Sequence, residues 1–534
     1  MRLSIGFSGV AGLRGASFLA ALGLLTAVSI PNALAARHAA SPAARPGGTL
    51  LYRDTGTPTC VDPLKAPTTV EGVVDYATFD NLVLLDGKGN IRPDLATSWS
   101  YSHGGKWITF KLRHGVRFSN GDPVTASVIK YNLDRVLGPV GQQAGMSSFL
   151  GPLHKIVVDN PYKVTLITTA PFRPIMPGLA NDSLGIIDPK ALRKMGATKY
   201  CEYPVGSGPY MITNYAPGGT SITEVRNPYR NWEVPWAFNQ GKPYLNKIVF
   251  KPILSDSTAV SALLSGGVNL SAIAGSQLSR VQNNPSVKLH KVLSQLMYQL
   301  VFNTAHAPFN KPAVRRAIGE ALNRGALIKA ALNNLGRPAF SPIPSNVNFY
   351  NPASKQYATK YNPAAAKKVL QANHVTGTYT LISGNAPAVT TADELIQAEL
   401  AQVGVNIKIV SKPTPDYITM GEKGQFDIAL DGFYAADADI LYLEFDSTQE
   451  VSGGLNFTNY KNPNLDRLIV AGRSTFNKVK ATRAYNQVQK FLLQQGLSIP
   501  LWSPVTVFGT RTSVKGFHTD VTGLFPLFPD LYVK

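Results

Sequence analysis

The chain has 534 residues, a formal net charge of +20, 44% hydrophobic residues and 16% charged residues. Two to four domains of about 150 residues fit this length, and the hydrophobic content argues against an intrinsically disordered chain. The long apolar run at residues 16–30 is shorter than the roughly 20 residues that span a bilayer, which argues against an integral membrane protein.

The first 35 residues have the parts of a secretory signal peptide. Arg2 and Arg14 supply positive charge, residues 16–30 are apolar, and residues 33–35 (ALA) fit a cleavage site. The alternative, a buried N-terminal helix, lacks a capping residue. We expect a periplasmic protein with a cleavable signal peptide at residues 1–35, followed by a flexible mature N-terminus at residues 36–47. Because no cysteine lies near the cleavage site, we do not expect a lipoprotein.

The basic charge does not indicate a nucleic-acid partner. Removal of residues 1–35 takes away two arginines and no acidic residue, which leaves a net charge of +18. The lysines and arginines are scattered and form no run of five or more, unlike the clusters that mark nucleic-acid contacts, and export separates the protein from nucleic acid. We therefore predict a solvated basic surface.

The chain contains two cysteines, Cys60 and Cys201. In an oxidising compartment they have one intramolecular pairing, and closing so long a loop would contribute about 4–5 kcal/mol in the chain-entropy model. The sequence favours this disulfide over the alternative of two buried free thiols.

Strand and helix patterns alternate from residue 48 onward. Residues 107–113 alternate apolar and polar side chains, which predicts a strand with one buried face, and residues 125–137 have helical spacing. Asn310 and Pro312 predict a capped helix start, with a stop at Gly336.

The C-terminal third gives the clearest unit. Residues 391–394 (TADE) form a capping-box pattern that predicts a helix start there. With expected strands at residues 379–383 and 405–410, this predicts a β-α-β unit. A helix at 477–495 and a strand at 499–508 follow. The whole indicates a mixed α/β, two-lobed protein whose chain crosses between lobes more than once.

Few catalytic patterns are present. A phosphate-binding GxxxxGK[ST] loop, HExxH and CxxC are absent, and the eight histidines do not pair at metal-binding spacing. Residues 206–208 (GSG) lack the first glycine of a nucleophile elbow. We therefore expect no catalytic residues, no metal site, no cofactor and no enzymatic activity.

The segment at residues 431–439 (DGFYAADAD) combines acids with aromatic residues. It has too few ligands for a calcium loop. Two interpretations remain: a solvated turn, or a ligand-binding loop that receives a cation or ammonium group.

Residues 92–99 (RPDLATSW) and 107–126 (WITFKLRHGVRFSNGDPVTA) resemble the signature of the family 5 extracellular solute-binding proteins of ABC importers, the peptide/nickel/opine group. Further blocks similar to that family follow in the expected order, at residues 204–210 (PVGSGPY), 264–270 (LSGGVNL), 302–304 (FNT), 308–309 (PF), 314–318 (VRRAI), 361–363 (YNP), 366–368 (AKK), 460–463 (YKNP) and 499–501 (IPL). The resemblance covers roughly residues 48–530.

The chain departs from the family pattern at several acids. Asn269, Asn323 and Asn362 stand where the family usually has carboxylates. An amide keeps size and hydrogen bonding but does not titrate near pH 4. We expect a protein that works in acidic surroundings and loses little stability at pH 4, whereas a steep loss between pH 5 and pH 4 would contradict this.

A second departure lies in the loop at residues 432–439. In peptide-binding relatives, an acid after a Gly-Trp pair holds the ligand's ammonium group. Here Gly432 and Phe433 occupy the Gly-Trp position, and either Ala436 or Asp437 takes the place of the acid.

The resemblance implies an α/β periplasmic-binding-protein fold, two lobes with a hinge and a ligand cleft between them. Lobe I would comprise residues 48–285 with 500–534, and lobe II residues 286–499. The resemblance further implies ligand-binding residues at the cleft, for which the candidates are Thr57, Tyr298, Phe433, Tyr434, Asp437, Asp439 and Trp502. Asp437 would neutralise a cationic end, and Asp437→Asn would weaken binding by about 1.5–3 kcal/mol.

The implied function is capture of a peptide or a similar small polar solute by a monomer that delivers it to ABC permease subunits in the inner membrane. The alternatives are a binder of a nickel chelate, haem, an opine or another non-peptide solute, a partner of a chemoreceptor, and an exported hydrolase.

Overall fold

The computed structural model describes residues 47–534 except 88, 235, 236, 452 and 453. Residues 1–35, the expected signal peptide, and most of the expected flexible N-terminus lie outside the described residues. The described residues belong to one compact unit.

A large mixed sheet forms the framework of this unit. Its strand order is β16-β15-β17-β13-β18-β11-β1-β10-β9-β8, and β12 and β14 also pair with β18. We call the part built on β1, β8–β11 and the separate four-stranded sheet the first lobe, and the part built on β13 and β15–β17 the second lobe. The strands of the large sheet are β1 (Thr49–Asp54), β8 (Tyr210–Tyr215), β9 (Ile222–Arg226), β10 (Lys247–Pro252), β11 (Leu270–Ala272), β12 (Val287–Leu293), β13 (Leu296–Phe302), β14 (Gly336–Pro338), β15 (Thr378–Gly384), β16 (Asn406–Lys412), β17 (Ile428–Tyr434) and β18 (Ile499–Arg511).

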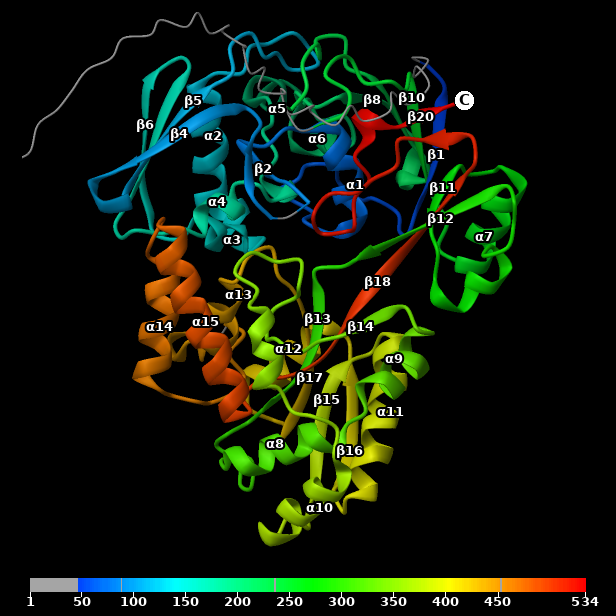
Figure 1. The fold of residues 1–534 in the computed structure, drawn as a ribbon. Coiled ribbons are helices and arrows are strands. Elements are labelled where there is room, and N and C mark those ends of the chain that lie inside the picture. Colours follow the sequence, from blue (N-terminus) through cyan, green and yellow to red (C-terminus); the bar gives the residue numbers. More distant parts are fainter. Residues whose placement is uncertain (1–46, 88, 235–236, 452–453) are drawn as a thin grey trace, which may run out of the picture. The chain divides into compact units, whose positions relative to one another are not determined.

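The chain passes between the lobes at two places that lie side by side. β18 begins beside β13 of the second lobe, where Tyr298 is paired with Trp502, and continues beside β11 and β12, where Leu293 is paired with Val505. The short connection from β12 to β13 makes the second passage (Figure 1). The expected strand at 499–508 is thus present, and it is three residues longer at its end.

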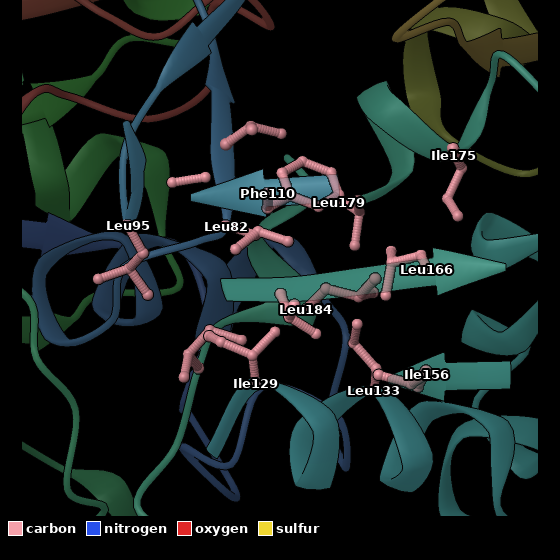
Figure 2. Close-up of a cluster of buried hydrophobic side chains, with 14 of the residues drawn as sticks. Leu82, Leu95, Phe110, Ile129, Leu133, Ile156, Leu166, Ile175, Leu179 and Leu184 are labelled. Atoms are coloured by element: carbon pink, nitrogen blue, oxygen red, sulfur yellow. The ribbon is translucent and has the colours of Figure 1, made fainter. Parts of the chain in front are cut away.

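The first lobe adds a four-stranded antiparallel sheet in the order β4-β5-β7-β6. The expected strand at 107–113 is β5, and its buried residues Ile108, Phe110 and Leu112 face a cluster that also takes in Ile129 and Leu133 of α2 (Figure 2). These elements are β4 (Ala96–Ser102), β5 (Trp107–Leu112), β6 (Leu153–Asn160), β7 (Lys163–Thr168) and α2 (Ala126–Leu137).

Shorter elements complete the first lobe. They are α1 (Thr69–Thr78), α3 (Pro139–Gln143), α4 (Ile175–Gly178), α5 (Pro189–Met195), α6 (Ala197–Glu202), α7 (Asp256–Ser265), the two-stranded sheet β2 (Val83–Leu85) with β3 (Ile91–Pro93), and β19 (Val514–Lys515) with β20 (Tyr532–Val533).

The second lobe contains the expected β-α-β unit, because β15 and β16 pair in parallel and α11 packs on both. The helix starts earlier than its capping-box pattern predicts. α11 begins at Pro387, and the Thr391 hydroxyl donates to the Pro387 carbonyl within the helix. The expected cap at 391–394 is therefore wrong: an apolar face that begins at Val389 outweighs the local capping signal.

The expected helix from Asn310 to Gly336 is two helices. α8 starts after Lys311, which makes no side-chain cap, and ends at Ala321. Asn323 then caps α9 by accepting hydrogen bonds from the amides of Gly325 and Ala326. The chain does not continue as one helix, because the Asn323 side chain binds the backbone N–H groups of the next residues and so starts a new helix. The helices of this lobe are α8 (Pro312–Ala321), α9 (Arg324–Leu332), α10 (Pro363–Ala372), α11 (Pro387–Gln402), α12 (Thr414–Glu422), α13 (Ile440–Phe445), α14 (Pro463–Arg473) and α15 (Lys478–Gln495).

The asparagines at the family's acidic positions act as hydrogen-bond acceptors. Asn269 accepts from the Leu51 amide, and Asn362 caps α10 by accepting from the Ala365 amide. Together with Asn323, they use an amide oxygen where a carboxylate would accept the same bond. The oxygen of an amide remains an acceptor at acidic pH.

Candidate ligand-binding site between the two lobes

A cavity of about 430 Å³ has walls from both lobes. The first lobe contributes the start of α1, the segment around Phe149, residues near α4 and the chain near Phe525. The second lobe contributes the loop from β17 to α13 and the end of α14, and Gln295 lies at the passage between the lobes. A cavity of this size falls within the roughly 300–1,000 Å³ of small-ligand sites.

An arginine from the first lobe joins the two walls. Arg173 donates two hydrogen bonds to Asp437, at 2.8 Å from Nη1 to Oδ2 and 2.5 Å from Nη2 to Oδ1. Arg173 also donates to the Tyr485 hydroxyl at 3.1 Å and lies 4.6 Å above the Phe349 ring. Burial alone would lower the pKa of Arg173, but Asp437 and Tyr485 raise it above its ordinary value. The guanidinium therefore stays charged and neutralises Asp437.

A second ion pair follows within the same loop. Arg473, at the end of α14, donates to both carboxylate oxygens of Asp439 at 3.0 and 2.9 Å. Its guanidinium also lies 3.3 Å from the centre of the Tyr442 ring. Burial raises the pKa of Asp439 to about 6 even though Arg473 opposes the shift.

Three of the candidate residues from the sequence line this cavity: Tyr434, Asp437 and Asp439. Tyr434 is 47% exposed, so its ring is available to a ligand. Asp437 lies in the loop that the sequence indicated, but both of its carboxylate oxygens are bound by Arg173. Since Ala436 also lines the cavity, this loop carries no unpaired carboxylate at either of the two alternative positions.

The other candidates lie away from the cavity lining. Phe433 is buried with Met297 and Val347, and Trp502 is 1% exposed within the second-lobe core. Tyr298 stacks on Trp502 with ring centres 5.1 Å apart, and burial raises the pKa of its hydroxyl to about 12. Thr57 is exposed on the loop after β1. These aromatic residues pack the sheet that supports the site.

Cys60 and Cys201 are joined in a disulfide with an S–S distance of 2.01 Å. The bond ties the loop after β1 to α6, and the Val61 amide donates to the Cys201 carbonyl beside it. It anchors the segment that leads to Thr68 and Thr69 in the cavity wall.

The sequence did not indicate Asp182 or Gln295, which both line the cavity. Asp182 lies in the turn after α4, and burial raises the pKa of its carboxyl to about 6. Gln295 is 1% exposed, and neither its amide nitrogen nor its amide oxygen has a hydrogen-bond partner. Neither residue belongs to a recognisable motif, so only the folded chain brings them together.

Among the described residues, no group of three or more His, Cys, Asp or Glu side chains could hold a metal ion. In the same part of the chain, no helix is both long enough and apolar enough to cross a membrane.

The arrangement defines a class of protein: a two-lobed α/β receptor with a small-molecule cavity between its lobes. The sequence model of the bacterial extracellular solute-binding proteins, family 5, matches residues 90–451. The chain belongs to this family, which confirms the resemblance found in the sequence.

Individual relatives agree with this assignment. The chain is 26% identical over 513 residues to the glutathione-binding protein GsiB of Escherichia coli K12, covering 94% of this chain and 96% of GsiB. The structure of AgaA from A. tumefaciens R10 in complex with agropinic acid is 25% identical, with a TM-score of 0.74, and covers 91% of this chain and 99% of AgaA. The structure of DppA from Helicobacter pylori with the peptide STSA has a TM-score of 0.74 at 24% identity, covering 92% and 98% of the two chains.

Proposed function

We propose that this protein is the solute-binding component of an ABC importer, which captures a peptide or a small polar solute of similar size. The observation that carries the proposal is the cavity of about 430 Å³ with walls from both lobes. Relatives that bind glutathione or a short peptide support the peptide class. The ligand would be enclosed when the lobes close and would be passed to permease subunits in the membrane.

The proposed movement follows from the way the chain connects the lobes. β18 and the connection from β12 to β13 are the passages in the described sheet. A rotation about two adjacent passages would separate the walls, and a ligand that contacts both walls would bias the equilibrium toward closure. The Arg173–Asp437 ion pair would favour the closed arrangement, because its partners belong to opposite lobes.

We also propose the lobe boundaries, the route of export and the oligomeric state. Lobe I would comprise residues 48–285 with 500–534, and lobe II residues 286–499. Residues 1–35 would direct export to the periplasm and be removed, without lipid attachment. The mature protein would act as a monomer, without enzymatic activity and without a nucleic-acid partner.

Native mass spectrometry tests this function. The mature protein, purified without refolding, is incubated with an equimolar mixture of di- to tetrapeptides of acidic, neutral and basic composition. We expect one peptide per protein chain, lost on mild denaturation. If the folded protein retains no peptide at 100-fold excess, the peptide class is wrong, and opines and metal chelates become the solutes to test.

A further inference from the structure

The two walls of the interlobe cavity differ in the charge that they leave uncompensated. On the second-lobe wall, Asp437 and Asp439 are each held by an arginine. On the first-lobe wall, Asp182 has no basic side chain within ion-pair distance in the described part of the chain. The uncompensated charge of the cavity is therefore negative and lies on the first lobe.

Further acidic groups lie near Asp182. Asp182 also lines a smaller cavity of about 60 Å³, together with Asp75, Asp94 and Arg230, and the charge of Arg230 is taken up by Asp80 and Glu233. Asp75 Oδ1 and Asp94 Oδ1 are buried there without a hydrogen-bond partner. Such a space holds a few water-sized groups, which is about the size of an ammonium or guanidinium head. With a pKa of about 6, the Asp182 carboxyl is mostly ionised at pH 7.

Gln295 supplies the second observation. Its carboxamide lines the cavity with a free donor and a free acceptor, both shielded from water. An unpartnered buried polar group is costly, and the cost is recovered when a partner arrives. A primary amide of this kind pairs best with a group that offers both an acceptor and a donor, such as a peptide or carboxamide unit.

The cavity offers little to an anion. Among the described lining residues, Arg473 is the one basic side chain, and its charge is balanced by Asp439. A ligand carboxylate would therefore have to lose its hydration without gaining a free cation, which is strongly unfavourable.

We propose that the site takes a cationic amide: the ligand's ammonium or guanidinium group binds Asp182, which lines both cavities, and an amide unit of the ligand pairs with Gln295. This inference rests on the proposed function and narrows its substrate class. Peptides that carry a free amine and lack an ionised carboxylate at the cavity fit it, whereas a dianionic peptide such as glutathione does not.

Calorimetric titration of the mature protein at pH 7 with four matched peptides tests the proposal. The probes are Ala-Leu-amide, Ala-Leu, N-acetyl-Ala-Leu-amide and N-acetyl-Ala-Leu, with glutathione as a fifth. We expect Ala-Leu-amide to bind tightest and acetylation to weaken binding about 10- to 100-fold, the scale of a charged hydrogen bond. Equal binding of the acetylated and free amides would overturn the proposal while leaving the import function standing. If none of the five binds, the peptide function itself fails.

Substitutions of Asp182 and Gln295 distinguish a loss of ligand contacts from a general loss of folding. Asp182→Asn should weaken Ala-Leu-amide about 10- to 100-fold and leave the acetylated amide unchanged. Asp416→Asn is the matched control. Asp416 is exposed on α12, so this substitution removes the same charge away from the cavity. If Asp182→Asn binds Ala-Leu-amide with wild-type affinity, Asp182 does not contact the ligand.

Gln295→Leu gives a sharper signature than a loss of affinity alone. Leucine removes the unpartnered donor and acceptor from a buried position, so the ligand-free protein should melt at a higher temperature. Binding of Ala-Leu-amide should weaken in the same variant. A purely structural role for Gln295 predicts a lower melting temperature, and unchanged affinity would show that the amide does not contact the ligand.

Discussion

The carboxyl groups on the two walls of the interlobe cavity behave differently. In the loop from β17 to α13, Asp437 and Asp439 each bind an arginine through both oxygens. On the first-lobe wall, Asp182 is held by backbone amides and has no arginine partner among the described residues, and burial raises its pKa to about 6. Elsewhere in this lobe, Asp54 and Glu224 are likewise held by backbone amides or a hydroxyl, and burial raises their pKa values to about 7 and 8. A carboxylate near the cavity is thus available to a ligand only where no arginine reaches it.

The largest expected effect on stability comes from removing Arg173, the cation that binds Asp437. Arg173→Ala leaves Asp437 buried without a counter-charge, so the free energy of unfolding should fall by about 3–5 kcal/mol. Urea denaturation of the purified variant measures this. The double variant Arg173→Met with Asp437→Leu should recover most of the loss, because no buried charge is left unpaired. A loss below about 1 kcal/mol in the single variant would contradict the account of this ion pair.

The first lobe has a covalent cross-link in addition to its packing. The Cys60–Cys201 disulfide closes a loop with a sequence separation of 141, and its removal should cost about 2–5 kcal/mol. Cys60→Ser with Cys201→Ser, compared with wild type in urea, gives the value. Stability equal to that of the oxidised wild-type protein would show that the cross-link adds nothing to this lobe.

Buried acids without an arginine partner should make the stability of the protein depend on pH. Asp54 and Glu224 have folded pKa values of about 7 and 8, above their unfolded values near 4. The folded state therefore binds more protons between pH 4 and pH 8, and stability falls as the pH rises through this range. We expect a gain of at least about 2 kcal/mol on going from pH 8 to pH 5. Asp54→Asn with Glu224→Gln should flatten the profile, and a wild-type profile that rises toward pH 8 would contradict this.

The smallest effect concerns the helix cap of α9. Asn323→Asp should change stability by less than about 1 kcal/mol at pH 7, since both side chains cap a helix well. At pH 3 the aspartic acid is protonated and caps poorly, so the variant should lose up to about 1 kcal/mol relative to wild type. Parallel thermal melts at both pH values measure the difference. Equal behaviour at pH 3 would show that the amide gives no advantage in acid.

The sequence predicted elements where several signals agreed. The helix expected at 477–495 is α15, which Asn477 caps and which Gly496 follows, and β15, α11 and β16 form the expected unit. Local caps misled the prediction at Asn310 and at Thr391, because helix boundaries in the second lobe depend on which apolar faces reach the core.

The site was predicted less completely than the fold. The loop containing Asp437 was placed in the cavity, but its partner Arg173 lies 264 positions away in the sequence. No pattern along the chain indicates that these side chains meet. Asp182 and Gln295 carried no motif either, because their importance comes from the partners that they lack in the folded protein. Such an absence is visible only in three dimensions.

The most direct test of the account is a crystal structure of the mature protein with Ala-Leu-amide bound. We predict the peptide in the cavity between the lobes, with its ammonium group within hydrogen-bonding distance of Asp182 and its amide paired with Gln295, while Arg173 still holds Asp437. A peptide that displaces Arg173 and places its ammonium group on Asp437, or one that binds outside this cavity, would contradict it.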